Sequence, residues 1–168
     1  VGDIPLQATR ISTFTYTSQS PEEPDYILFV HGWRLQPWER RAFAETAYKR
    51  LWHQGYKGRF GLFSWPTEWH DGRRTSHLSD PRNFDNSERK AWKSGPALAG
   101  LLSSLNGQYP GRVRVFAHSM GNVVTSEALL LSDQPGLVHT FVATQAAVAA
   151  HAYNSAAPTI LPGATTPN

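Results

Sequence analysis

A serine between a predicted strand and a predicted helix constrains the fold of this chain most. The pentapeptide 117–121, Ala-His-Ser-Met-Gly, follows the apolar run 113–116 and precedes a segment with helical periodicity, 122–131. Strand, sharp turn and helix, with the serine at the turn, are typical of a nucleophile elbow. Small residues are needed two before and two after the serine, where strand and helix backbones pass closely. The turn would present the Ser119 hydroxyl to the N-terminal N–H groups of the helix, which stabilise an oxyanion.

A second apolar run, Tyr-Ile-Leu-Phe-Val at 26–30, has the composition of a strand buried on both faces of a parallel sheet. It is followed by His-Gly-Trp, which ends at Trp33. In an α/β-hydrolase the loop after this strand supplies the second N–H group of the oxyanion hole. We therefore expect the backbone N–H groups of Trp33 and Met120 to form that hole.

Three motifs carry a resemblance to a known family: Ile27–Trp33 (ILFVHGW), Phe63–Pro66 (FSWP) and Phe116–Asn122 (FAHSMGN). Together they resemble the bacterial α/β-hydrolases of the "domain of unknown function 900" type, over about residues 26–150. That group is similar to lipases and esterases. The resemblance implies a three-layer α/β fold, in which a mainly parallel sheet is flanked by helices.

The remaining patterns divide the chain into one domain, 1–150, and a C-terminal tail, 151–168. Hydrophobic residues make up 40% and charged residues 17% of the chain, which is typical of a globular domain. A long polar segment, 67–85, is predicted to be a lid or a wall of the substrate site, and a capping box beginning at Asp85 is predicted to start the next helix. The predicted strands are 9–17, 26–30, 59–65, 112–117 and 137–144, and the predicted helices are 37–52, 85–105 and 120–131.

A catalytic triad also needs an acid and a histidine besides the serine. In an α/β-hydrolase they follow the serine in the order acid, histidine. The residues after Thr144 are too few for two further βαβ units of about 30 residues each. We therefore expect a truncated hydrolase domain that lacks the C-terminal strands.

Few residues after Ser119 could complete the triad. Asp133 and His139 flank the entrance of the strand 137–144, so they should lie at the opposite edge of the sheet from Ser119. His151 lies beyond the other end of that strand, and we expect it to be the general base. His70 and His77 in the polar loop stay open as alternatives.

Two further histidines, which belong to the motifs, are predicted to have structural roles. We expect His31 and His118 to brace the oxyanion loop and the elbow by hydrogen bonding. No HxxxH or HxH spacing is present, so neither a metal nor another cofactor is expected.

Aromatic residues near the predicted strand ends indicate the class of substrate. Trp33, Trp65 and Trp69 could line an apolar acyl pocket, with Trp65 and Trp69 as substrate-binding residues. The resulting hypothesis is a serine hydrolase that cleaves carboxylic esters of short or medium chain, or lactones, through an acyl-enzyme at Ser119. Two alternatives stay open: a hydrolase-like binding module with little or no activity, and a metal-dependent lactone hydrolase.

Charge and hydropathy bear on partners and location. The net charge is only +3 and the basic residues are scattered, which argues against a nucleic-acid partner. The chain has no cysteine, and no signal peptide or membrane-spanning run is visible, so the compartment is undetermined. The strand 137–144 could present an unpaired edge, and we expect a homo-oligomer through it.

Overall fold

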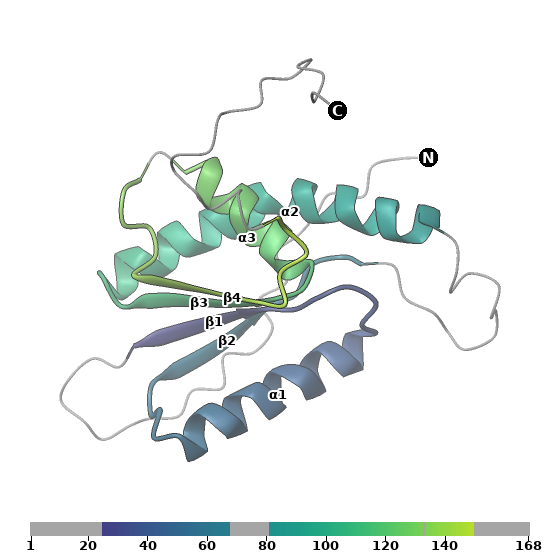
Figure 1. Ribbon diagram of the computed structural model, residues 1–168. Helices are drawn as coiled ribbons and strands as arrows, with labels where there is room; N and C mark the ends of the chain where they lie inside the picture. Colours follow the sequence, from purple (N-terminus) through teal and green to yellow (C-terminus); the bar gives the residue numbers. More distant parts are fainter. Residues whose placement is uncertain (1–24, 68–80, 133, 150–168) are drawn as a thin grey trace.

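The computed structural model describes residues 25–67, 81–132 and 134–149. In these ranges a four-stranded sheet, in the order β2-β1-β3-β4 with every neighbouring pair parallel, is flanked by three helices. One helix covers one face of the sheet and two cover the other (Figure 1). The expected three-layer α/β fold with a parallel sheet is confirmed.

The elements follow the predicted order. The strands are β1 (Tyr26–Val30), β2 (Arg59–Phe63), β3 (Val113–His118) and β4 (Thr140–Thr144), and the helices are α1 (Pro37–His53), α2 (Pro81–Gln108) and α3 (Gly121–Leu130). Because all four strands run in the same direction, the serine turn and the loops after β1 and β2 lie together at the C-terminal ends of the strands. The predicted edge strand 9–17 and the tail 151–168 lie outside the described residues.

Alternating side chains of the central strands build two cores. Between the sheet and α1, Phe29 packs with Ala44 and Phe60. Between the sheet and α2 with α3 lies a larger cluster that includes Leu28 and Val115. A fully buried side chain of this size, such as Phe29, contributes about 1.5–3 kcal/mol to folding. The sheet is therefore fixed from both sides, as expected of strands whose runs are apolar throughout.

The starts of two elements differ from the prediction by three or four residues. Helix α2 begins at Pro81, not at Asp85, so the last residues of the predicted loop 67–85 are helical and the capping box was wrong. Proline is favoured in the first helical turn because its missing N–H would have no partner there. Strand β4 begins at Thr140, not at Leu137, and Leu137 is buried in the core ahead of the strand. Residues 68–80 of the predicted lid lie outside the described residues.

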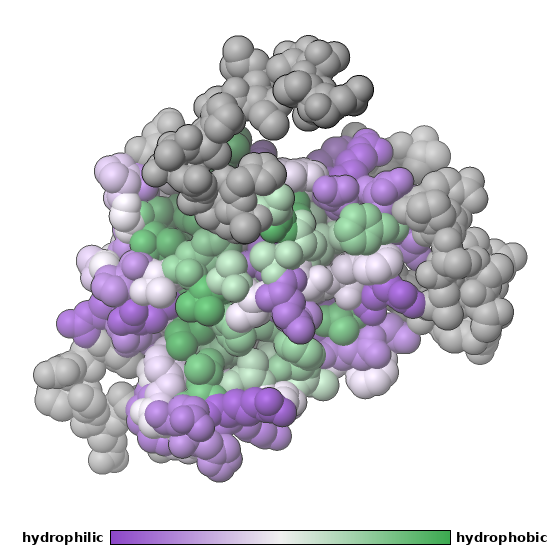
Figure 2. Space-filling model, viewed as in Figure 1, coloured by the Kyte–Doolittle hydropathy of each residue, from purple (hydrophilic) through white to green (hydrophobic). Residues whose placement is uncertain are grey.

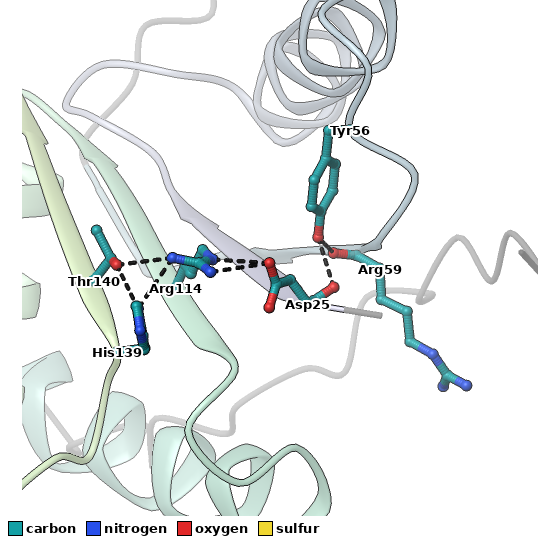
Figure 3. A network of polar contacts seen from close by, with 6 residues as sticks. All are labelled: Asp25, Tyr56, Arg59, Arg114, His139 and Thr140. Atoms are coloured by element: carbon teal, nitrogen blue, oxygen red, sulfur yellow. Dashed lines mark hydrogen bonds and ion pairs between the residues drawn. The ribbon is translucent and has the colours of Figure 1, made fainter. Parts of the chain in front are cut away.

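A polar network lies at the end of the sheet where the strands begin, opposite the serine turn (Figure 3). The Arg114 guanidinium donates to Asp25 Oδ2 (3.0 and 3.1 Å) and to Thr140 Oγ1 (3.0 Å), and its Nη1 also lies 3.0 Å from Nδ1 of His139. The hydroxyl of Tyr56 bonds to the Asp25 carbonyl oxygen at 2.7 Å, and burial raises the pKa of this phenol. The network joins the starts of β1, β3 and β4.

Candidate active site

Ser119 occupies a sharp turn directly between β3 and α3. Its φ is +51°, in the left-handed region that an L-residue with a side chain rarely adopts. Helix α3 begins two residues later, and the serine is partly exposed. Such strained positions cluster at functional sites, where the surrounding structure holds them. The geometry is that of the predicted strand–turn–helix elbow.

Two glycines allow the turn to pack tightly against the end of β1. A Cβ on Gly121 would stand 2.5 Å from the Val30 carbonyl oxygen and 2.6 Å from that of His31. A Cβ on Gly32 would stand 3.0 Å from Ser119 Cβ. The predicted need for a small residue after the serine is confirmed at Gly121, and the loop after β1 lies directly beside Ser119.

The end of β4 holds the backbone of the turn. The N–H of Ser119 donates to the Thr144 carbonyl oxygen at 3.0 Å, and the Ala147 N–H donates to the Ser119 carbonyl oxygen at 3.2 Å. The Asn122 side chain donates to that same Ser119 oxygen at 2.8 Å and to the Thr144 oxygen at 3.3 Å. Both polar groups of the serine backbone are therefore fixed by residues outside the pentapeptide.

The two predicted oxyanion donors belong to the residue after Ser119 and to the loop after β1. Met120 precedes the first residue of α3, and its side chain is 1% exposed in the core. Trp33 directly follows Gly32, and its ring packs edge-on against Phe84 of α2 with centroids 5.1 Å apart. Within the described part of the chain, neither of these two backbone N–H groups donates a hydrogen bond.

A buried histidine braces the loop after β1. His31 Nδ1 lies 2.7 Å from the Gly32 carbonyl oxygen, and Nε2 accepts from the Trp65 N–H at 3.2 Å. The two rings stack with centroids 5.3 Å apart, and the Trp65 indole N–H donates to the His31 carbonyl oxygen at 2.7 Å. Burial, and next the charge of Arg40, lower the pKa of His31 to about 3, against backbone hydrogen bonds that raise it. At neutral pH the imidazole is therefore uncharged, and it braces the loop by hydrogen bonds, as predicted.

Trp65 and Arg40 complete this support. Trp65, predicted to bind substrate, is 1% exposed and lies beneath the loop in the core. Arg40 is 9% exposed, and its guanidinium donates to the Leu35 carbonyl oxygen at 2.9 Å and to Ser64 Oγ at 3.1 Å. These bonds tie the loop after β1 to the residue after β2. The shape of the loop after β1 therefore depends on side chains from α1 and from the segment after β2.

His118 makes the second predicted brace. Its Nε2 lies 2.8 Å from Gln145 Oε1, and its ring meets Phe43 of α1 with centroids 5.3 Å apart. Gln145 directly follows β4 and has a φ of +43°. The imidazole is therefore held between the end of β4 and helix α1.

Several predicted residues do not join this arrangement. His151 and Trp69 lie outside the described residues, as do His70, His77 and Asp133. His139 hydrogen-bonds with Thr140 at the opposite edge of the sheet, as expected. Among the described residues, no three histidine, aspartate or glutamate side chains gather into a group that could hold a metal ion.

The sequence analysis missed Asn122, Thr144 and Gln145. Asn122 had a local signal, since it stands in the first turn of the helix after the serine, where its amide reaches back to the turn. Gln145 had none, because its contact with His118 spans 27 positions and depends on the pairing of β3 with β4. Only the assembled sheet shows these residues together.

An open parallel sheet with a left-handed serine between strand and helix, and a glycine-containing loop packed beside it, defines the class of the α/β hydrolases. The chain belongs to the family described as "Alpha/beta hydrolase of unknown function (DUF900)", which matches residues 9–136. No curated protein and no solved structure matches the chain. The described residues contain no helix with the length and apolarity needed to cross a membrane.

Proposed function

We propose that this α/β hydrolase cleaves carboxylic esters, including lactones, through an acyl-enzyme at Ser119. The observation that carries the proposal is the left-handed turn at Ser119, which places a partly exposed serine between β3 and the start of α3. A hydroxyl in this position lies at the positive end of the helix dipole. That field favours the negative charge that develops when a carbonyl is attacked.

Two backbone donors support the same chemistry. Ser119 Oγ would attack the ester carbonyl, whose oxygen would be held by the N–H groups of Met120 and Trp33. Met120 directly follows Ser119, Trp33 directly follows Gly32, and no described residue accepts a hydrogen bond from either backbone N–H. The loss of one such donor costs about 2.7–4 kcal/mol in transition-state stabilisation.

The substrate-binding and base assignments have different support. Trp33 is partly exposed and follows Gly32 in the loop after β1, so its ring could contact an acyl chain. Trp65 is buried, and we assign to it the support of that loop from the core. Trp69 as a wall of the site and His151 as the base stay predictions about residues outside the described ranges. The proposal of ester hydrolysis at Ser119 does not depend on either of them.

Hydrolysis of p-nitrophenyl esters of graded chain length tests the proposal, with the unmodified chain beside Ser119→Ala. We expect turnover that falls at least about 100-fold in the variant, with an unchanged circular dichroism spectrum. Turnover equal to the Ser119→Ala background for every ester and for a matched set of lactones would contradict it. The chain would then be better described as a hydrolase-like binding module.

We also propose a second copy of this chain as a partner, docked along β4. Among the described residues β4 pairs only with β3, and Val142 of β4 is 46% exposed. An edge strand with free N–H and C=O groups is a template for pairing with another strand. Besides a second copy of the chain, the partner that we propose is the small-molecule substrate, an ester or a lactone.

A further inference from the structure

Two buried side-chain atoms near the serine turn have no hydrogen-bond partner among the described residues. They are Nε1 of Trp33, in the loop after β1, and Oδ1 of Asn83, in the first turn of α2. Buried polar groups are nearly always paired in proteins, because an unpaired group has given up its hydrogen bonds to water without replacement. The indole nitrogen only donates and the amide oxygen only accepts. The two atoms are therefore complementary to a ligand group that does both.

Both atoms belong to the contact between the loop after β1 and the start of α2. The Trp33 ring packs edge-on against Phe84, the residue after Asn83, with centroids 5.1 Å apart. Ser87 lies one helical turn after Asn83 on the same face of α2, and its Oγ is 3.4 Å from Thr67 Oγ1. That Thr67 oxygen accepts the backbone N–H of the residue after Trp33 at 3.3 Å. The face of α2 that carries Asn83 therefore lies against the loop that carries Trp33.

This contact is next to the proposed nucleophile and close to the surface. A Cβ on Gly32 would stand 3.0 Å from Ser119 Cβ, and the Cα of Trp33 is only about 3.8 Å further along the chain. Trp33 and Asn83 are partly exposed as residues, and Phe84, which lies between them, is 38% exposed. A substrate held at Ser119 could thus reach both polar atoms once the Phe84 ring turns aside.

We infer that Trp33 and Asn83 form a polar subsite that selects esters and lactones whose acyl part carries a hydroxyl group. The indole N–H of Trp33 donates to the hydroxyl oxygen, and the hydroxyl donates to Oδ1 of Asn83. A hydroxyl is the smallest neutral group that does both, and a charged group would not be compensated between two neutral buried atoms. The inference rests on the proposed ester hydrolysis at Ser119 and deepens it by naming the substrate class.

The subsite is assigned to the acyl part because of the backbone of the same loop. The Trp33 N–H is proposed to hold the carbonyl oxygen, which stays with the acyl group after the alcohol has left. A hydroxyl on the acyl part is therefore bound in both halves of the reaction. A site built to bond a hydroxyl also discriminates against an analogue without it, because the buried partners are then left unpaired.

The preference for p-nitrophenyl 2- or 3-hydroxybutanoate over p-nitrophenyl butanoate, as a ratio of kcat/KM, tests the inference. Each variant then serves as its own reference. We expect the unmodified chain to prefer the better of the two hydroxy esters by about tenfold, the equivalent of one hydrogen bond. Trp33→Phe keeps an aromatic ring and the backbone N–H but removes the donor, and Asn83→Leu removes the acceptor at similar volume. Each should bring the ratio close to one.

Two matched variants separate the subsite from general effects of such substitutions. Trp38→Phe removes an exposed indole whose N–H already donates to Gln36 Oε1 at 3.1 Å, and Asn86→Leu removes an exposed amide from the same helix as Asn83. Both should keep the ratio of the unmodified chain. Circular dichroism checks that each variant is folded.

The NMR signal of the Trp33 indole N–H gives a readout that needs no turnover. In Ser119→Ala, the signal that is lost on adding Trp33→Phe should move downfield with ethyl 3-hydroxybutanoate or its 2-hydroxy isomer, and much less with ethyl butanoate. A signal that no ester moves, or equal kcat/KM values for all three esters in the unmodified chain, would mean that these atoms hold water only and would overturn the inference. Equal values would still leave ester hydrolysis intact, whereas a moving signal in a chain that hydrolyses no ester would support the subsite and refute the acyl-enzyme.

Discussion

At the scale of single residues, three described left-handed positions that are not glycine lie in the loops at the site. Arg34 has a φ of +63°, Ser119 a φ of +51° and Gln145 a φ of +43°. Each such position costs about 1–3 kcal/mol unless its surroundings compensate. Here the hydrogen bonds of Thr144, Ala147 and Asn122 supply that compensation for Ser119. The strain is thus local, and its support comes from β4, from the segment after β4 and from α3.

His31 makes stability depend on pH. Its pKa is about 3 in the folded chain, against an ordinary value of 6.5. Below pH 6.5 the unfolded chain therefore binds a proton that the folded chain does not bind until about pH 3. The free energy of unfolding should fall in this window by up to about 1.4 kcal/mol per pH unit from this group.

Urea unfolding between pH 7 and pH 4 measures this effect. We expect His31→Gln to be less stable than the unmodified chain at pH 7, but with a shallower dependence of unfolding free energy on pH. His53→Gln, an exposed histidine, serves as the matched control and should keep the original slope. Equal slopes for His31→Gln and the unmodified chain would show that His31 is not the group responsible.

At the scale of elements, most of the fold could be predicted from the sequence. The strands β1 and β3 are continuous or alternating apolar runs, and the Pro37 start of α1 has a local signal, so pattern and propensity suffice. The start of α2 at Pro81 was missed because the capping-box pattern at Asp85 was a competing local signal. At the site, Ser119 was predictable, whereas Gln145 and Thr144 were not, because their contacts exist only after β3 and β4 pair.

The spacing between α3 and β1 depends on Gly121. Its missing Cβ would lie 2.5 Å and 2.6 Å from two backbone carbonyl oxygens, which have no side-chain freedom to move away. We expect Gly121→Ala to lower the free energy of unfolding by about 2–3 kcal/mol. Chemical denaturation measures it.

Gly100 of α2 offers the matched control for this substitution. A Cβ there meets no described atom within 4 Å, so Gly100→Ala should stabilise the chain by about 0.5–1 kcal/mol through helix propensity. If the two variants have the same stability, close packing of α3 on β1 is not what requires a glycine.

The polar network at the opposite edge of the sheet joins three strands through Arg114. The ion pair with Asp25 is about one-third exposed on both sides, so solvent weakens it. We expect Asp25→Ala to cost about 0.5–1 kcal/mol in a low-salt buffer. Because an exposed pair is screened, the difference should shrink in about 1 M NaCl. Thermal unfolding at both salt concentrations measures it, and a salt-independent difference would point to the backbone contacts of this residue instead.

At the scale of the whole molecule, β4 borders an apolar part of the surface. Figure 2 shows hydrophobic residues gathered across the middle of the face that Figure 1 presents, with polar residues above and below. Val142 of β4 is 46% exposed, and Leu130 and Leu131 at the end of α3 are 79% and 51% exposed. This surface is the support for the proposed pairing of two copies.

Sedimentation of the unmodified chain beside Val142→Lys tests that pairing. A lysine on an edge strand opposes strand-to-strand association because its charge would have to be desolvated. We expect the unmodified chain to form a dimer at micromolar concentration and the variant to shift toward the monomer. An unmodified chain that sediments as a monomer at every concentration would rule out the proposed homo-oligomer.

The hydrogen bonds between the end of β4 and the backbone of Ser119 also determine when, during folding, the serine can become reactive. The strand residues that are buried in the two cores belong to β1, β2 and β3, so much of the apolar core can form before β4 pairs with β3. The serine turn gains its N–H acceptor only when Thr144 arrives. During refolding, fluorophosphonate reactivity should therefore lag behind tryptophan fluorescence. A chain in the act of folding would be compact while its serine is still unreactive.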